Sequence, residues 1–170
     1  TDVPLARMVD PMMNATMAET ALWAVLSLQR GFFGYAAQQR DGVWRQHPLR
    51  RAADFNVSVL GLGQMGQRAA EALIHQGYRV TGWSARDGAA ALPQALARAD
   101  AVVNLLPLTP ATRGLFNAAT LALLPCGAGL VNLARGEHVV EADLLAALDD
   151  GRIGHAVLDV FETEPLPPGH

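Results

Sequence analysis

The sequence contains no lysine, and this absence narrows the chemistry that the chain can perform. All 13 basic residues are arginines, in a chain of 170 residues with a net charge of −3. Without lysine there is no side-chain amine for Schiff-base or general-base catalysis. The arginines are scattered rather than clustered. No nucleic-acid surface and no polybasic membrane patch is therefore expected.

Cysteine and long apolar runs are also scarce. The lone Cys126 has no partner for an internal disulfide and no second thiol for a zinc cluster. No metal site is therefore expected, and a reducing cytoplasm is the expected location. The apolar runs end well before the roughly 20 residues that a membrane-spanning helix needs. With 51% hydrophobic and 17% charged residues, the chain is predicted to form one folded unit.

The beginning of the chain has the pattern of a helix. Residues 10–40 are predicted to form one long helix, with a capping box from Thr16 to Glu19 and apolar residues at helical spacing. This helix has more apolar surface than one short face needs, so it is a candidate for a subunit contact as well as for core packing. A polar linker is expected at about 45–54.

Residues 55–165 alternate between short apolar runs and helix-like stretches. The predicted strands are 56–61, 78–83, 101–106, 128–134 and 155–160, and helix-like stretches such as 65–76 and 140–149 lie between them. Continuous apolar strands are typical of a sheet buried on both faces. Strand–helix alternation requires parallel strands with right-handed crossovers. The pattern predicts a doubly wound α/β domain of the Rossmann type, with residues 1–170 as a single dinucleotide-binding domain.

A glycine motif joins the first predicted strand to the helix that follows it. Gly61, Gly63 and Gly66 form G-x-G-x-x-G. In this context the first glycine permits a tight turn, the second lets a pyrophosphate approach the backbone, and the third packs the helix on the strand. The amides of Gln64 and Met65 are then expected to point at the phosphates. The alternative is a glycine turn without a ligand.

The stretch "TGWSARD" follows the second predicted strand, where an NAD-binding protein places an acid for the ribose hydroxyls. Ser84 stands there instead, and Arg86 follows closely. A serine hydroxyl and a guanidinium can both bind a 2′-phosphate, so NADP(H) is the expected cofactor. Two alternatives stay open: Arg86 is a solvated loop residue that pairs with Asp87, or Asp87 turns inward and restores NAD(H) binding.

Arg135 follows the fourth predicted strand, at the edge where open α/β folds bind ligands. Its guanidinium suits a substrate carboxylate and can polarise an adjacent 2-oxo group. The alternatives are an arginine that caps the next helix or one that pairs with Glu137.

Three segments together resemble the D-isomer-specific 2-hydroxyacid dehydrogenases: "GLGQMG", "LLPLTPATRGLF" and "VNLARGEHVVEADLLAALDDGRIGHAVLDVFETEPLP". The "WS" pair and "NLARGEHVVEADLLAALDDG" are most similar to the glyoxylate/hydroxypyruvate reductase A branch. The resemblance covers nearly the whole chain from the N-terminal helix onward. It implies a homodimeric enzyme that uses NADPH to reduce a small 2-oxo acid, glyoxylate or hydroxypyruvate, to the 2-hydroxy acid.

The resemblance also assigns roles to individual residues. It implies that Arg135 binds the substrate, that Glu164 orients a catalytic histidine and raises its pKa, and that Asp159 meets the nicotinamide carboxamide. Glu162 is the nearby competitor of Glu164 and is expected to be solvated. Four further residues are implied to line the dinucleotide cleft, although strand-end core positions explain them equally well: Leu106, Pro107, Leu133 and Ala134.

The chain departs from the family pattern in three ways, one of which is that Ala85 separates Ser84 from Arg86, where the reductase branch often places the arginine directly after the serine. The family's catalytic histidine lies in a Pro-His pair after the E-P segment and is expected beyond residue 170, so none of the histidines is assigned to this role. The substrate-binding domain is expected to be largely absent, and this portion alone is expected to be inactive.

Two other function classes remain as alternatives. One is a 3-hydroxyacid dehydrogenase or imine reductase, although the former class relies on a lysine. The other is a dinucleotide-sensing regulatory protein of the same fold.

Overall fold

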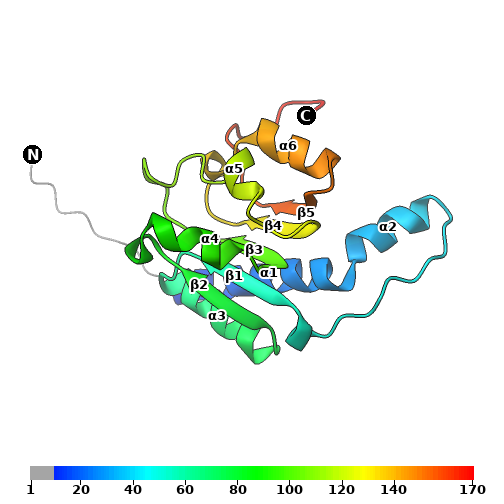
Figure 1. The fold of residues 1–170 in the computed structure, drawn as a ribbon, viewed down its shortest axis with the longest axis horizontal. Coiled ribbons are helices and arrows are strands. Elements are labelled where there is room, and N and C mark those ends of the chain that lie inside the picture. The colour runs from blue at the N-terminus through cyan, green and yellow to red at the C-terminus, as the bar shows by residue number, and fades with distance from the viewer. Residues whose placement is uncertain (1–9) are drawn as a thin grey trace, which may run out of the picture.

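The computed structural model describes residues 10–170 and contains a five-stranded sheet between layers of helices (Figure 1). The strands are β1 (Asn56–Leu60), β2 (Arg79–Trp83), β3 (Ala101–Asn104), β4 (Ala128–Asn132) and β5 (Ile153–Leu158). Their order is β2-β1-β3-β4-β5, and every neighbouring pair is parallel. This confirms the predicted Rossmann-type α/β fold, with each strand close to its expected position.

Successive residues of the central strands pack on opposite faces of the sheet, which is why these strands are apolar throughout. Val57, Val59 and Val103 belong to the core on one face, whereas Val102 and Leu130 belong to the core on the other. Two helices cover the first face: α1 (Pro11–Arg30) and α3 (Gln64–His75). Three cover the second: α4 (Leu92–Leu96), α5 (Ala118–Leu121) and α6 (Glu141–Asp149).

The predicted single helix over 10–40 is wrong in one respect, because two helices occupy this range. Helix α1 ends at Arg30, and α2 (Phe32–Arg40) begins after Gly31, whose φ of 67° lies in the left-handed region. Glycine adopts this conformation without steric cost and commonly ends a helix. No helix in the described part of the chain is long and apolar enough to span a membrane.

The predicted capping box from Thr16 to Glu19 is also wrong. The carboxylate of Asp10 caps α1 by accepting a hydrogen bond from the Met12 amide at 2.9 Å. Thr16 lies inside the helix, where its hydroxyl donates to the Met13 carbonyl at 3.0 Å. A threonine within a helix satisfies its hydroxyl in this way, so the S/T-x-x-E pattern alone does not locate the helix start.

An arm formed by α2 and residues 41–50 extends beyond the sheet (Figure 1). Internal hydrogen bonds hold it: the His47 amide donates to the Tyr35 hydroxyl at 2.9 Å, and the Gln38 side chain lies 2.8 Å from the His47 ring. The arm nevertheless leaves large apolar side chains in solvent, with Trp44 94% and Leu49 84% exposed.

Candidate active site

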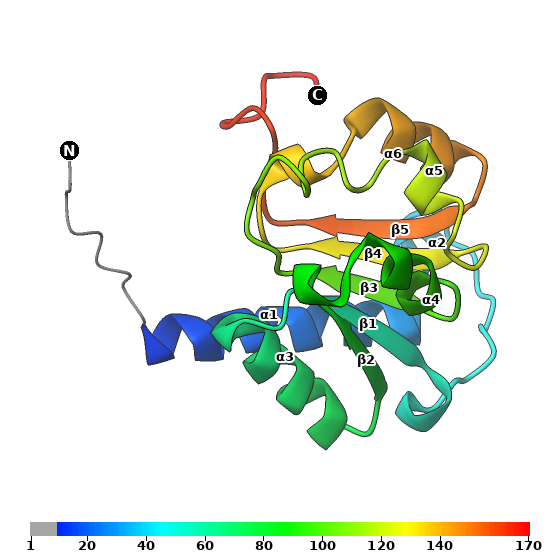
Figure 2. The ribbon, with the colours of Figure 1, turned by 60° about the vertical axis from the view of Figure 1, so that its left-hand side comes forward.

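The candidate site lies along the sheet edge where the five strands end. Because all strands are parallel, the loops that follow them start at the same edge (Figure 2). The chain passes from β1 outward to β2 and then crosses to β3 on the other side, which makes the β1–β3 boundary the point where open α/β folds bind ligands. Every predicted site residue except Glu164 lies in the first residues after a strand or in the turn that follows: Gly61, Gly63, Gln64, Met65, Gly66, Ser84, Arg86, Leu106, Pro107, Leu133, Ala134, Arg135 and Asp159.

Two of the three glycines in the first loop are required for steric reasons, and the third is not. Gly61 has a φ of 99°, and a side chain there would meet the Leu105 carbonyl at 2.6 Å. A Cβ on Gly66 would overlap with the carbonyl oxygen of Gly61, so α3 can approach β1 only through glycine. A Cβ on Gly63 would meet nothing within 4 Å. The fold itself requires the first and third glycines, whereas the second leaves open backbone facing solvent.

Helix α3 begins in this loop with its N-terminal amides uncapped by any described side chain. Gly63 occupies the cap position, and the first helical hydrogen bond runs from the Gln67 amide to the Gly63 carbonyl at 2.8 Å. The amides of Gln64 and Met65 precede this bond. An uncapped helix start of this kind attracts phosphate through its free N–H groups and the helix dipole.

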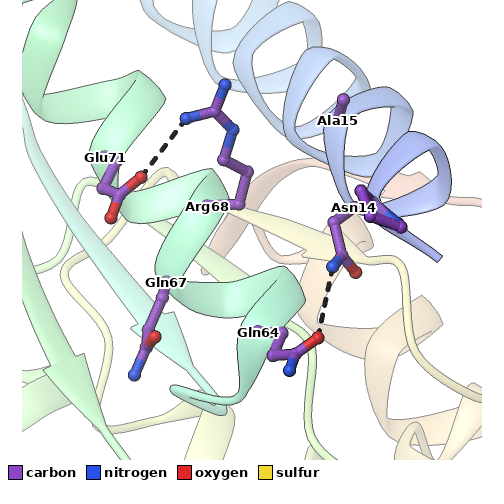
Figure 3. A pocket seen from close by; sticks show the side chains of 7 residues that line it. Asn14, Ala15, Gln64, Gln67, Arg68 and Glu71 are labelled. Atoms are coloured by element: carbon purple, nitrogen blue, oxygen red, sulfur yellow. Dashed lines mark hydrogen bonds and ion pairs between the residues drawn. The ribbon is translucent and has the colours of Figure 1, made fainter. Parts of the chain in front are cut away.

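The first turn of α1 lies beside the same loop. A shallow groove lies between α1 and α3: the Asn14 side chain of α1 donates to Gln64 Oε1 of α3 at 3.4 Å, and Arg68 and Glu71, both on α3, pair at 3.4 Å beside it (Figure 3). The glycine loop is therefore bordered by α1 on one side and by the β3 segment on the other.

The turn after β2 is organised by Asp87. Its carboxylate accepts hydrogen bonds from the Ser84 amide at 2.7 Å and from the Ser84 hydroxyl at 2.8 Å, and these bonds lower the pKa of Asp87. Arg86 is exposed and forms no ion pair within residues 10–170. The alternative in which Asp87 pairs with Arg86 is not what the structure shows, because Asp87 turns onto Ser84 instead.

Arg135 stands at the carboxyl end of β4 with its side chain exposed. One guanidinium nitrogen donates to the Ala134 carbonyl at 2.6 Å. Glu137 pairs with Arg113 at 3.7 Å rather than with Arg135, and no side chain caps the short 3-10 turn at Gly136–His138. Neither alternative for Arg135 is observed, so most of its donors remain available to a ligand.

Gly136 joins the Arg135 loop to the segment after β5. A Cβ on Gly136 would overlap with the backbone of Phe161 and Glu162, so only glycine lets these two segments cross. The carboxylate of Glu164, three residues after Phe161, accepts a hydrogen bond from the Phe161 amide at 2.8 Å. Glu162 and Glu164 are both exposed. The A-R-G and E-T-E-P segments are thus held against each other at the sheet edge.

The residues implied to line the cleft divide into buried and exposed ones. Leu106, Leu133 and Ala134 are 4–6% exposed and pack as strand-end core residues. Pro107 and Asp159 are exposed at the same edge. In the described residues no group of three or more histidine, cysteine or acidic side chains is arranged to hold a metal ion.

Two buried asparagines at this edge are not among the residues predicted from the sequence. Asn104 ends β3 and Asn132 ends β4, in register with each other, and the Asn104 amide donates to Asn132 Oδ1 at 2.9 Å. The other amide group of the pair, Asn132 Nδ2, donates to the Arg135 carbonyl at 2.9 Å. The available signal was an asparagine at the same place in two otherwise apolar strands, because a buried amide needs a partner.

His138 is likewise not among the site residues predicted from the sequence. Its ring is fully buried, with Nδ1 3.2 Å from the Arg135 carbonyl oxygen and Nε2 3.4 Å from the Pro107 carbonyl oxygen. Burial lowers the pKa of His138, and this effect outweighs the opposing one of the two carbonyls. The ring is therefore neutral at pH 7 and bridges the loops after β3 and β4.

A parallel Rossmann-type sheet whose glycine loop opens onto an uncapped helix is the architecture of a dinucleotide-binding protein. A family model described as D-isomer specific 2-hydroxyacid dehydrogenase, NAD binding domain, matches residues 22–170. The chain belongs to this family.

Solved structures of related proteins agree with this assignment. A D-isomer specific 2-hydroxyacid dehydrogenase from Xanthobacter autotrophicus Py2, in complex with NADPH and MES, is 48% identical with a TM-score of 0.96, over 100% of this chain and 57% of that one. A family member from Klebsiella pneumoniae 342 is 44% identical with a TM-score of 0.97, over 100% and 58%. The NADPH-dependent glyoxylate/hydroxypyruvate reductase of Sinorhizobium meliloti, in complex with NADP and sulfate, is 40% identical with a TM-score of 0.93, over 100% and 58%. The present chain thus spans less than two thirds of each.

Proposed function

We propose that the protein containing this chain uses NADPH to reduce a small 2-oxo acid, with glyoxylate and hydroxypyruvate as the best candidates. The observation that carries the proposal is the position of Arg135. Its guanidinium is exposed at the carboxyl edge of the sheet, on the loop that crosses the E-T-E-P segment through Gly136. The glycine loop opens onto the same edge. The related reductase from Sinorhizobium meliloti supports the choice of substrate.

The residues of the glycine loop fit the phosphates of a dinucleotide. Gly63 leaves open space that a Cβ would fill, and the uncapped amides of Gln64 and Met65 provide donors for a pyrophosphate. When bound, the cofactor supplies the hydride that reduces the keto carbon. Asp159, exposed after β5, is proposed to receive the nicotinamide carboxamide.

Arg135 and Glu164 are the proposed contributions of this chain to catalysis. The guanidinium of Arg135 holds the substrate carboxylate and stabilises the negative charge that develops on the 2-oxo oxygen. Glu164 orients a histidine and favours its protonated form, which donates the proton to the forming alkoxide. None of the histidines of this chain is assigned to that role. We therefore propose that residues 1–170 are the dinucleotide-binding domain and require a substrate-binding domain for turnover.

The preference for NADPH rests on Ser84 and Arg86. Arg86 is free of ion pairs in the described residues, and Ser84 provides an amide and a hydroxyl at the end of β2. Asp87 occupies both Ser84 donors in the structure, so a 2′-phosphate has to displace its carboxylate. Related proteins hold NADPH or NADP.

Calorimetric titration with NADPH and NADH tests the cofactor assignment. The full-length protein is expected to bind NADPH at least about tenfold more tightly, a difference of about 1.4 kcal/mol. Arg86→Ala should remove most of this difference without weakening NADH. Arg98→Ala is the matched control, because Arg98 is an exposed arginine just after α4. Equal or tighter NADH binding by the unmodified protein contradicts the preference.

The assay for the reaction itself compares Arg135→Gln with Arg98→Gln. With glyoxylate or hydroxypyruvate, loss of the Arg135 guanidinium should lower kcat/KM by at least about 100-fold, the usual cost of removing a donor to a developing oxyanion. NADPH binding should remain. If the full-length protein binds NADPH but reduces no 2-oxo acid, the dinucleotide-sensing regulatory function replaces the enzymatic one.

We also propose that a second copy of the protein is its partner, in a cytoplasmic homodimer. The arm supports this, because Trp44 and Leu49 expose apolar side chains that a partner would cover. Sedimentation of Trp44→Ser against the unmodified protein tests it. A dimer that becomes a monomer supports the proposal, and an unmodified protein that sediments as a monomer contradicts it. The cytoplasmic location stays a prediction.

A further inference from the structure

Two loops at the sheet edge are joined into one unit. The β3 loop (residues 105–117) and the β4 loop (residues 133–140) exchange three backbone hydrogen bonds, from Gly114 to Glu137 at 2.8 Å, from Phe116 to His138 at 2.9 Å and from Val140 to Phe116 at 3.0 Å. The β3 loop carries Pro107, and the β4 loop carries Arg135. The relative position of the two loops therefore sets the distance between Pro107, in one wall of the site, and Arg135, the proposed substrate-binding residue.

His138 lies inside this unit and faces both loops. Its two ring nitrogens lie against the carbonyl oxygens of Arg135 and Pro107, at 3.2 Å and 3.4 Å. The ring is fully buried, so water does not reach its nitrogens. The neutral ring donates its single N–H to one carbonyl and packs against the other, and a planar ring in this place sets the distance between the loops in a way that a flexible side chain cannot.

The Arg135 carbonyl has a second buried partner, the side chain of Asn132. Asn132 Nδ2 donates to it at 2.9 Å, and the partner of Asn132 in the neighbouring strand, Asn104, accepts a hydrogen bond from the Leu106 amide at 3.2 Å. Both asparagines are fully buried. The backbone of Arg135 is thus fixed by two buried side chains, while its guanidinium is exposed.

We propose that His138 is a positioning residue that sets the location of Arg135 relative to the Pro107 wall, with Asn132 as its second support. The inference rests on the proposed function, since it explains how Arg135 meets a 2-oxo acid. His138 touches neither substrate nor cofactor. It acts through the Arg135 backbone, and a misplacement of about 1 Å at a reacting group can lower the rate by about 100-fold.

The experiment compares three variants of the full-length protein. His138→Phe keeps a ring of similar size and removes the hydrogen bond that the single N–H of the neutral ring donates to one of the two carbonyls. His138→Gln keeps an amide that can reach one carbonyl. Ile153→Val is the control for stability alone, because Ile153 is fully buried in the core under α6 and lies at the amino end of β5, away from the loops. For each, KM and kcat with glyoxylate, the Kd of NADPH, the Tm and amide hydrogen exchange are measured.

His138→Phe is expected to raise the KM for glyoxylate and lower kcat/KM by about tenfold or more, with the Kd of NADPH unchanged within about twofold. Exchange should rise in residues 133–140 and not in residues 61–66. His138→Gln should recover part of the loss, and Ile153→Val should lower the Tm without changing KM. If His138→Phe lowers the Tm as Ile153→Val does and leaves KM unchanged, His138 is only structural and the proposal is overturned.

Two further outcomes are also decisive. If the unmodified protein reduces no 2-oxo acid, the proposed function fails by itself, and hydrogen exchange still decides whether His138 joins the loops: equal exchange in His138→Phe and the unmodified protein overturns the inference. If His138→Phe does not fold, His138→Gln and Asn132→Ser take its place, with the same expected rise in KM and unchanged NADPH affinity.

Discussion

The two halves of the sheet edge are built differently. On the β3–β4 side the loops are joined by backbone bonds, by a buried histidine and by a buried asparagine pair. On the β1–β2 side the glycine loop and the Ser84 turn are open, and within residues 10–170 the first amides of α3 have no side-chain cap and Arg86 has no ion pair. A reacting group needs a fixed position, whereas a long cofactor needs room to enter and free donors to bind. The contrast predicts that substitutions on the two sides change different measured properties of the protein.

The largest effect, a loss of stability, is expected from Gly66→Ala on the β1–β2 side of the sheet edge. Its new Cβ would overlap with the Gly61 carbonyl oxygen, so α3 must move away from β1. The free energy of unfolding should fall by about 3 kcal/mol or more, since a backbone atom cannot move aside as a side chain can. Urea unfolding measures this. Gly63→Ala is the control, with open space around the new methyl group, and a loss as large there would contradict the steric argument.

Gly136→Ala should instead disrupt the β3–β4 side of the sheet edge, where the loops are joined. The methyl group would force the Arg135 loop away from the backbone of Phe161. We expect kcat/KM for the 2-oxo acid to fall by about 100-fold, with NADPH affinity nearly unchanged. Steady-state kinetics and calorimetry on the same preparation separate the two quantities. Loss of NADPH binding in step with activity would mean that the two halves are not independent.

A smaller effect is expected from pH. Burial lowers the pKa of His138 in the folded state, so below the ordinary value of about 6.5 the unfolded chain binds the proton more tightly. The free energy of unfolding should therefore be at its full value above about pH 6.5 and fall as pH decreases from there, by at most about 1.4 kcal/mol per pH unit. Glu137, which raises this pKa, and Arg135, which lowers it, are the charged neighbours. Thermal unfolding between pH 7.5 and 5.5 should show a weaker dependence in His138→Gln.

The smallest effect is expected from Asp87→Asn on the open side. This change removes a negative charge that is hydrogen-bonded to Ser84, next to the proposed 2′-phosphate position. The ratio of NADPH to NADH affinity should rise by about threefold at low ionic strength, and less at high salt because the site is exposed. Competition binding at two salt concentrations measures it. A falling ratio would mean that Asp87 supports NADPH.

The elements of the fold could be predicted because each is encoded locally. Continuous apolar runs gave the strands, and the two glycines that the fold requires, Gly61 and Gly66, lie where strand and helix meet. The break of the first helix could not be predicted in this way. Gly31 has a φ of 67°, and a Cβ there would lie 3.6 Å from the His47 ring, which comes from the other end of the arm.

The site could be predicted only where a single loop defines it. Arg135 was found from its place after a strand. The partnership of Asn104 and Asn132 depends on β3 and β4 being neighbours in register, and strand order was not part of the prediction. His138 was missed for the same reason, since one of its two carbonyl partners, that of Pro107, belongs to the preceding strand's loop.

The arm has a consequence for the rate at which the proposed homodimer would form. Its exposed Trp44 lies on a segment already held by the bonds of Gln38, His47 and Tyr35. Ordering a loop during association costs entropy and slows productive encounters, and an arm that is ordered beforehand avoids that cost. Association through it should therefore proceed at the rate of a rigid docking surface, about 10⁵–10⁷ M⁻¹s⁻¹, and not at the slower rate of coupled folding and binding.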